Sequence, residues 1–118
     1  MNIEEVRTFC LALPGVTEDM PYGPDVLVFR IEGKIFMHIG LEREQPTIAI
    51  KHNPDKGTEL REKHDCITPA FHMNKMHWSD VVIENTIPDA MIQNLIRESY
   101  TIVFSKLPKA VRAKYPTD

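Results

Sequence analysis

A short run near the middle of the chain gathers side chains that could bind an anion. Residues 69–78 read PAFHMNKMHW and hold, in order, His72, Asn74, Lys75, His77 and Trp78, the only tryptophan of the chain. Lysine supplies positive charge, and histidine and asparagine supply hydrogen bonds, so such a surface suits a phosphate or a carboxylate. Two further lysines, Lys34 and Lys51, would join it if the ends of their strands lie close by.

The same run has a second, purely structural interpretation. In a hairpin, His72 and Asn74 would face one side and Phe71 and Met73 the other, because successive side chains of a strand alternate. His72 and Asn74 would then hold the turn by bonding backbone groups, while Trp78 fills the core. Both interpretations stay open from the sequence.

Other kinds of site find little support in the pattern. The five histidines show neither HxxxH nor HExxH spacing on an expected helix, and Cys10 and Cys66 are isolated, so we expect no metal site. Cys66, His72 and Asn74 are crowded into one expected strand, where the geometry of nucleophilic attack is hard to build. The chain contains no GxSxG elbow, no phosphate-binding glycine loop and no dinucleotide fingerprint. We therefore expect neither an enzyme nor a bound cofactor.

The elements that would position the run follow from hydrophobic periodicity and from glycine and proline. The apolar spacing predicts a first helix over residues 2–13, a loop over 17–24, strands over 26–31, 35–39 and 47–51, and a short, mostly polar helix from Asn53 to about His64. It then predicts strands over 66–72 and 77–84, joined by a turn at Asn74-Lys75, and a long helix that opens at Pro88 and ends before Pro108. Ser99 falls on the buried stripe of that helix, where we expect a packing role.

This order, α-β-β-β-α-β-β-α, predicts an α+β fold. Short successive strands with tight connections favour an antiparallel sheet. We therefore expect a two-layer sandwich in which a five-stranded antiparallel sheet carries the helices on one face. With 118 residues the chain is the size of one domain, residues 1–118.

Composition and charge limit the classes of protein to consider. The chain is 42% hydrophobic and 26% charged, as in soluble globular proteins, and we expect a cytoplasmic protein with reduced thiols and no membrane partner. The formal net charge of −3 argues against nonspecific DNA binding as the main role. Residues 105–115, however, carry four cations and no acid: Lys106, Lys109, Arg112 and Lys114. A local basic patch is thus compatible with the acidic total.

The run at 69–78 also resembles the signature of a known family. The pattern PxxHxNKxHW is complete here, and together with the Gly33-Lys34 turn, Ile50-Lys51 and Ser99-Tyr100 it resembles the MmcQ/YjbR family over nearly the whole chain. The resemblance implies a CyaY-like two-layer α/β domain with a five-stranded antiparallel sheet.

For function, the resemblance implies a binding protein rather than an enzyme. Members of the family are commonly labelled DNA-binding, so the first expectation is a partner of double-stranded DNA, held through phosphate contacts by Lys75, Lys106 and Lys109. The alternative is a small anionic ligand or a protein partner at the surface around His72–Trp78. The oligomeric state is left open, with a monomer favoured.

Overall fold

The computed structural model describes residues 1–70, 73–83 and 87–115. Its elements are, in chain order, α1 (Ile3–Leu11), β1 (Val16–Asp19), β2 (Val26–Ile31), β3 (Lys34–Gly40), β4 (Thr47–Lys51), α2 (Pro54–Lys63), β5 (Ile67–Pro69), β6 (Trp78–Val82), α3 (Asp89–Ser105) and α4 (Lys109–Arg112). The α+β class and the antiparallel sheet are confirmed. The predicted number of strands is wrong: the sheet has six, in the spatial order β1-β2-β3-β4-β6-β5.

The missed strand is β1, of which residues 17–19 fall in the loop that the sequence predicts for residues 17–24. All four of its residues pair with β2, from Val16 opposite Ile31 to Asp19 opposite Val28. The strand is short, lies at an edge and is mostly polar, so it lacks the apolar alternation that identifies a half-buried strand. Ion pairs of the Arg30 guanidinium with Asp19 (2.9 Å) and of Arg7 with Glu18 help to hold it in place.

Helix boundaries follow the capping signals of the sequence. Asn2 and Glu5 form a capping box at the start of α1, and the Asn53 side chain accepts a hydrogen bond from the Lys56 amide (2.8 Å) before Pro54 opens α2. The polar helix α2 still contributes Leu60 to the hydrophobic core.

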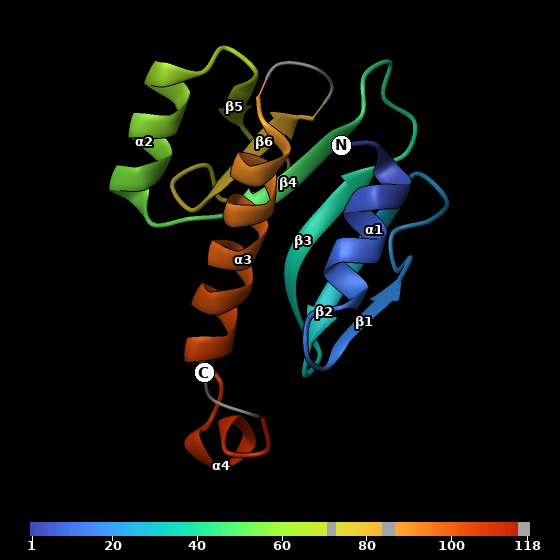
Figure 1. Cartoon of the computed structure of the whole chain (residues 1–118), viewed down its shortest axis with the longest axis vertical. Coiled ribbons are helices and arrows are strands. Elements are labelled where there is room, and N and C mark those ends of the chain that lie inside the picture. Colours follow the sequence, from blue (N-terminus) through green and yellow to red (C-terminus); the bar gives the residue numbers. More distant parts are fainter. Residues whose placement is uncertain (71–72, 84–86, 116–118) are drawn as a thin grey trace.

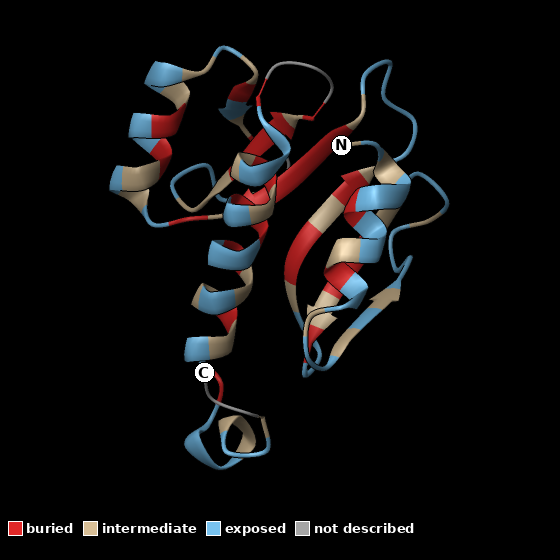
Figure 2. Cartoon of the chain, in the orientation of Figure 1, coloured by how far each residue is buried: buried red, intermediate tan, exposed pale blue. Residues whose placement is uncertain are grey.

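The helices that pack on the sheet lie on one of its faces, as predicted, and the short α4 lies beyond the end of α3 (Figure 1). The core fills the space between them, where the long helix α3 supplies Ile92, Leu95, Ile96 and Val103 and the strands supply Phe29, Met37 and Ile50. Buried residues accordingly concentrate on the sheet and on the inner side of α3, and the outer sides of the helices are exposed (Figure 2). Within the described ranges, no helix covers the opposite face of the sheet.

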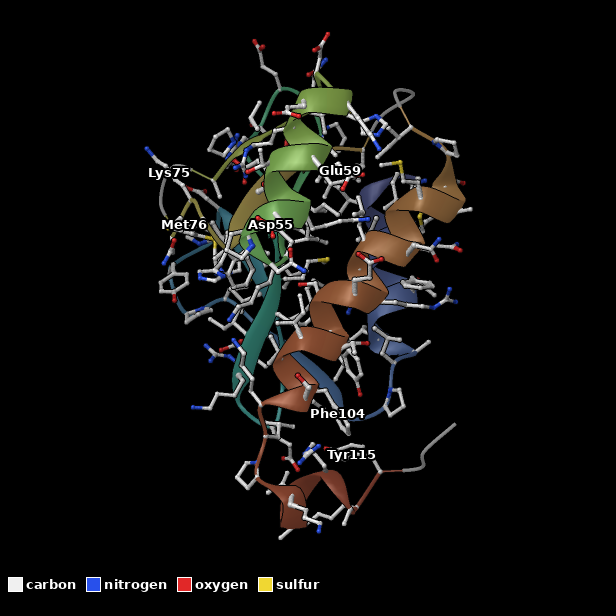
Figure 3. All side chains as sticks on the ribbon, turned by 90° about the vertical axis from the view of Figure 1, so that its left-hand side faces the viewer. Asp55, Glu59, Lys75, Met76, Phe104 and Tyr115 are labelled. Atoms are coloured by element: carbon white, nitrogen blue, oxygen red, sulfur yellow. The ribbon has the colours of Figure 1, made fainter. Side chains whose placement is uncertain are left out.

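Two contacts tie α3 into this arrangement. The Ser99 hydroxyl donates to the carbonyl of Phe36 on β3 and accepts from the amide of Lys51 on β4 (2.8 Å). Beyond the end of α3, the short helix α4 returns so that Tyr115 meets Phe104 edge to face, with ring centroids 5.5 Å apart (Figure 3).

No helix of the described residues is long and apolar enough to cross a bilayer.

Candidate functional site

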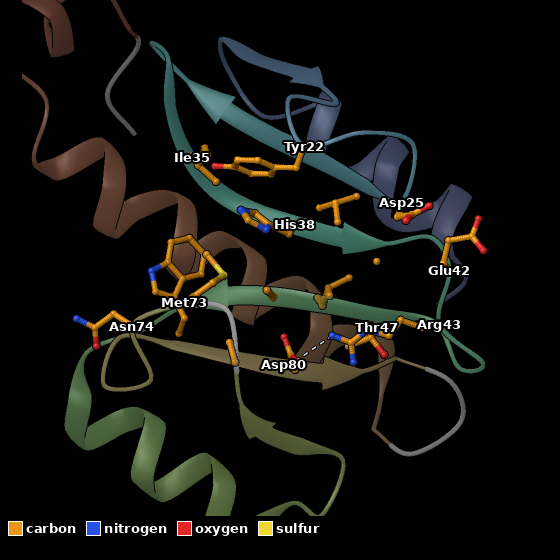
Figure 4. A pocket seen from close by; sticks show the side chains of 16 residues that line it. Tyr22, Asp25, Ile35, His38, Glu42, Arg43, Thr47, Met73, Asn74 and Asp80 are labelled. Carbon is orange, nitrogen blue, oxygen red and sulfur yellow. Dashed lines mark hydrogen bonds and ion pairs between the residues drawn. The ribbon is translucent and has the colours of Figure 1, made fainter.

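A pocket of about 1050 Å³ lies on the face of the sheet that the helices leave uncovered (Figure 4). The strand register explains the hollow. His38, Ala49 and Asp80 are cross-strand partners in one row over β3, β4 and β6, on the face opposite to the core residues. Because alanine is the smallest of the three, the middle of the row is low, and the pocket has room above it.

Aromatic rings form one wall of the pocket. The His38 imidazole lies between Tyr22 and Trp78, with ring centroids 6.1 Å from Tyr22 and 5.9 Å from Trp78. Met73 contributes a flexible apolar side chain to the same end. Tyr22 belongs to the loop between β1 and β2 and is 66% exposed, so it can move without disturbing the core.

His38 is the polar group of this aromatic end. Its Nε2 atom is buried and has no hydrogen-bond partner among the described residues. Burial, together with the charge of Arg30, lowers the pKa of His38, so the ring is neutral at pH 7. A buried nitrogen without a partner costs about 1–3 kcal/mol, which a bound molecule recovers if it supplies the missing hydrogen bond.

The other end of the pocket is charged. Asp80 is buried and accepts a hydrogen bond from the guanidinium of Arg43 at 3.3 Å. Arg43 reaches Asp80 across Gly40, where a side-chain carbon at residue 40 would come within 3.1 Å of Arg43 Cγ. Asp25 and Glu42 line the same end (Figure 4). Three carboxylates and one guanidinium therefore surround this end of the pocket.

The predicted turn at Asn74-Lys75 is confirmed, but the strands flanking it are shorter than predicted. The Asn74 carbonyl accepts from the amides of His77 (3.1 Å) and Trp78 (2.9 Å), and its side-chain oxygen accepts from the Met76 amide (3.0 Å). Since Asn74 lies outside the strands β5 and β6, the predicted alternation fails: Met73 and Asn74 both line the pocket. Asn74 thus combines the turn-holding role with a place at the pocket rim.

The remaining candidate residues of the 69–78 run lie in different places. Phe71 and His72 lie outside the described residues. Lys75 is exposed and points outward with Met76 at the tip of the turn (Figure 3). The backbone carbonyl of His77 accepts from the amide of His52 (2.8 Å), on the path from β4 to α2, and His77 does not line the pocket. Trp78 is half-buried in the pocket wall.

Lys51, one of the two lysines predicted to join the surface, lies beside Trp78. Lys51 Nζ is 5.8 Å from the centroid of the Trp78 ring, and burial together with the charge of Lys106 lowers the pKa of Lys51. Lys51 and Lys106 therefore share one region of the surface. Lys34, at the start of β3, and Lys109, at the start of α4, are exposed, and neither lines the pocket.

Sequence reasoning missed the aromatic and charged residues that line the pocket outside the 69–78 run, among them Tyr22, Asp25, His38, Glu42, Arg43 and Asp80. A usable signal existed for two of them. His38 interrupts the apolar strand FMHI, and Asp80 precedes the apolar run VVI, so each places a polar side chain inside a sheet. Tyr22 and Arg43 come from loops, and nothing in the sequence relates those loops to the run at 69–78.

On the face of the sheet that carries the helices, the side chains of a second polar cluster are joined by hydrogen bonds. His52 Nε2 lies 2.7 Å from the Ser79 hydroxyl, which also accepts a hydrogen bond from the Arg61 guanidinium (2.9 Å). His52 Nδ1 lies 2.8 Å from the Asn53 carbonyl. Ser79 and His52 are buried, so this serine–histidine pair holds α2 against β6 and is closed to a substrate. Among the described residues, no group of three or more histidine, cysteine or acidic side chains could hold a metal ion.

Comparison with known proteins identifies the family of the chain. The family model YjbR matches residues 11–102. The chain belongs to the YjbR family. The uncharacterised protein YjbR of Escherichia coli K12 is 29% identical over 112 residues, which cover 95% of each chain. The uncharacterised protein YbdF of Escherichia coli O157:H7 is 37% identical over 106 residues, covering 90% of this chain and 87% of the relative.

Two solved structures share the fold of this chain. A Deinococcus radiodurans protein described as a DUF419 domain superposes with a TM-score of 0.90 at 29% identity, covering 96% of this chain and 86% of the other. A Pseudomonas syringae protein superposes with a TM-score of 0.75 at 27% identity, covering 86% of this chain and 98% of the other. The names of these four proteins state no activity.

Proposed function

We propose that this YjbR protein is a non-enzymatic binding domain that holds a small planar heteroaromatic molecule on the helix-free face of its sheet. The observation that carries the proposal is the buried Nε2 of His38, which lies between two aromatic rings in the wall of a large pocket and has no partner in the described part of the chain. A ring that enters beside Tyr22 and Trp78 gains aromatic contacts of about 0.5–1.5 kcal/mol each. A nitrogen or oxygen on that ring supplies the partner that Nε2 lacks.

The exposure of Tyr22 gives the ligand its route. Nε2 is buried in the free protein, so a neighbouring group must move before a ligand can reach it. Tyr22 is the ring to move, since it lies on a loop that contains Gly23, whose φ of 108° is favourable only for glycine. The backbone of Trp78 is held on one side by pairing with Lys51 of β4 and on the other by a hydrogen bond from the Ala70 amide to the Trp78 carbonyl (3.4 Å).

Protein-detected NMR tests the proposal with quinoline, benzimidazole and adenine as probes. Trp78, the only tryptophan, gives one indole N–H signal, and this signal should shift on titration together with the amides of β3 and β6. Naphthalene, which has the shape of quinoline without the ring nitrogen, should bind about tenfold more weakly because it cannot form the hydrogen bond to His38. The variant His38→Phe should bind quinoline and naphthalene equally. The absence of a saturable shift with all three heteroaromatic probes would contradict the proposal.

Double-stranded DNA is a second candidate partner, favoured by the proximity of Lys51 and Lys106. Burial and the charge of Lys106 lower the pKa of Lys51, and a phosphate bound beside the two cations would relieve the repulsion between them. The exposed Lys109 and Lys114 follow along the chain. Phosphate contacts of this kind position a protein on DNA without reading its sequence.

Gel retardation of a short duplex at low salt tests this candidate. The double variant Lys106→Ala/Lys109→Ala should weaken binding and make the salt dependence of the logarithm of the binding constant shallower by about 1 for each phosphate that the variant no longer binds. Lys56→Ala/Lys63→Ala, which removes two lysines from α2, is the matched control for net charge. If both double variants weaken binding equally, the effect is one of total charge and the assigned surface is wrong.

A further inference from the structure

We infer that the ligand of the pocket carries a positively charged group, held by the carboxylates at the end opposite to the aromatic wall. This inference rests on the proposed heteroaromatic site and adds the charge of its ligand. Among the described residues, the charged side chains that line the pocket are unequal in sign: Asp25, Glu42 and Asp80 are negative and Arg43 is positive. An anion would meet three carboxylates there, whereas an ammonium would be attracted by them.

The spacing of the two ends suits one small molecule. His38 and Asp80 lie in the same row, one on β3 and the other on β6, with Ala49 of β4 between them. Adjacent strands are about 4.8 Å apart, so two steps across the sheet amount to roughly 10 Å. A ring that bonds His38 Nε2 therefore needs only a short side chain to bring an ammonium to Asp80, above the low point at Ala49.

In the free protein Arg43 is hydrogen-bonded to Asp80, and the cationic group of a ligand can take the place of Arg43. The Arg43 side chain is 51% exposed, while that of Asp80 is only 11% exposed. Their contact of 3.3 Å is long for a charge-assisted hydrogen bond. Arg43 can thus turn into solvent at little cost, whereas Asp80 stays in the pocket and gains from a cation that comes with the ligand.

Three quinolines separate this inference from the proposed site: quinoline, its aminomethyl derivative and its carboxylate, substituted at the same ring carbon. The aminomethyl compound should bind about tenfold more tightly than quinoline at low salt, since the added contact is a charge-assisted hydrogen bond, and the carboxylate more weakly than quinoline. Added salt should reduce the difference among the three.

Substitutions identify the side chains that cause the preference for the aminomethyl compound. Asp80→Asn should reduce the preference for the aminomethyl compound over quinoline, and Arg43→Gln should tighten the binding of the aminomethyl compound by removing one competitor for Asp80. Glu44→Gln, an exposed acid of the same loop that does not line the pocket, is the matched control and should leave the preference unchanged. If Asp80→Asn does not fold, the double variant Asp25→Asn/Glu42→Gln, at two exposed positions, should still reduce the preference.

The possible outcomes are distinct. If quinoline binds and its carboxylate binds as well as or better than the aminomethyl compound, the inference is overturned and the heteroaromatic site stands. If the aminomethyl preference persists in Asp80→Asn and in the double variant, the assigned carboxylates are wrong. If none of the three quinolines shifts the Trp78 signal, the proposed site and the inference fail together.

Discussion

Gly57 of α2 lies directly against the imidazole of His52: a methyl group at residue 57 would come within 2.1 Å of the His52 Cε1 atom. The contact explains a glycine in the interior of a helix, where it ordinarily costs about 1 kcal/mol relative to alanine. The close approach lets His52 lie under the helix and reach Ser79.

Gly57→Ala should therefore destabilise the protein despite the better helix propensity of alanine. We expect a decrease of about 1–3 kcal/mol in the free energy of unfolding, the usual cost of overpacking a buried site. Urea denaturation followed by circular dichroism measures it. Thr58→Ala, at the next and exposed position of α2, is the control and should change stability little. A stabilised Gly57→Ala variant would mean that His52 can move away freely.

Stability should fall as the pH is lowered from 7.5 to 5. Burial is the main cause that lowers the pKa of both His38 and His52 in the folded protein. The unfolded chain, with histidine pKa values near 6.5, then binds more protons than the folded protein, so unfolding becomes easier as the pH falls below about 6.5 and the decrease continues down to the folded pKa values. Each histidine contributes a slope of at most about 1.4 kcal/mol per pH unit.

The two histidines can be separated by substitution. The stabilities of His38→Gln and His52→Gln, measured by urea denaturation between pH 7.5 and 5, should each depend less steeply on pH than that of the unmodified protein. Glu18 and Glu59, whose pKa values ion pairing with Arg7 and Lys63 lowers below the usual 4.5, affect stability only at lower pH. A stability that is flat over this range would contradict the buried, neutral state of both rings.

Ser99→Ala should cost about 1–3 kcal/mol of stability, because it leaves the amide of Lys51 and the carbonyl of Phe36 without their partner. Hydrogen exchange should show a faster rate at the Lys51 amide in the variant. Ser105→Ala removes a hydroxyl at the exposed end of the same helix and should have an effect of less than about 0.5 kcal/mol. Equal effects of the two changes would contradict the bridging role of Ser99.

The sequence predicted most of this fold, and the reasons for its failures are physical. Strands such as Val26–Ile31 and Thr47–Lys51 carry strong apolar signals, and Asn53-Pro54 marks its helix start directly. The sequence does not predict strand β1, because the strand forms through pairing with β2 and through ion pairs with arginines of other elements. Propensity does not report such tertiary contacts.

Of the residues proposed from the sequence, Asn74 and Trp78 line the pocket. The run at 69–78 leads into β6, but the pocket exists because the register places His38, Ala49 and Asp80 in one row. A register is a relation between strands, and a shift of one residue would turn all three side chains to the other face. The charge of the pocket likewise depends on which loops reach it, so the predicted anion surface and the observed acidic end could not be distinguished from the chain alone.

Ala49→Leu provides a direct test of the pocket, because it fills the low point of the row between His38 and Asp80. We expect the variant to fold, since the added carbons extend into the pocket rather than into the core, and to bind quinoline at least about tenfold more weakly, as steric exclusion requires. NMR titration of the Trp78 indole signal measures the binding, and urea denaturation checks the fold. Ala90→Leu, on the exposed side of α3, is the matched control and should bind quinoline normally. Unchanged binding in Ala49→Leu would show that quinoline binds elsewhere, and a large decrease in stability would show that the space above Ala49 is not open.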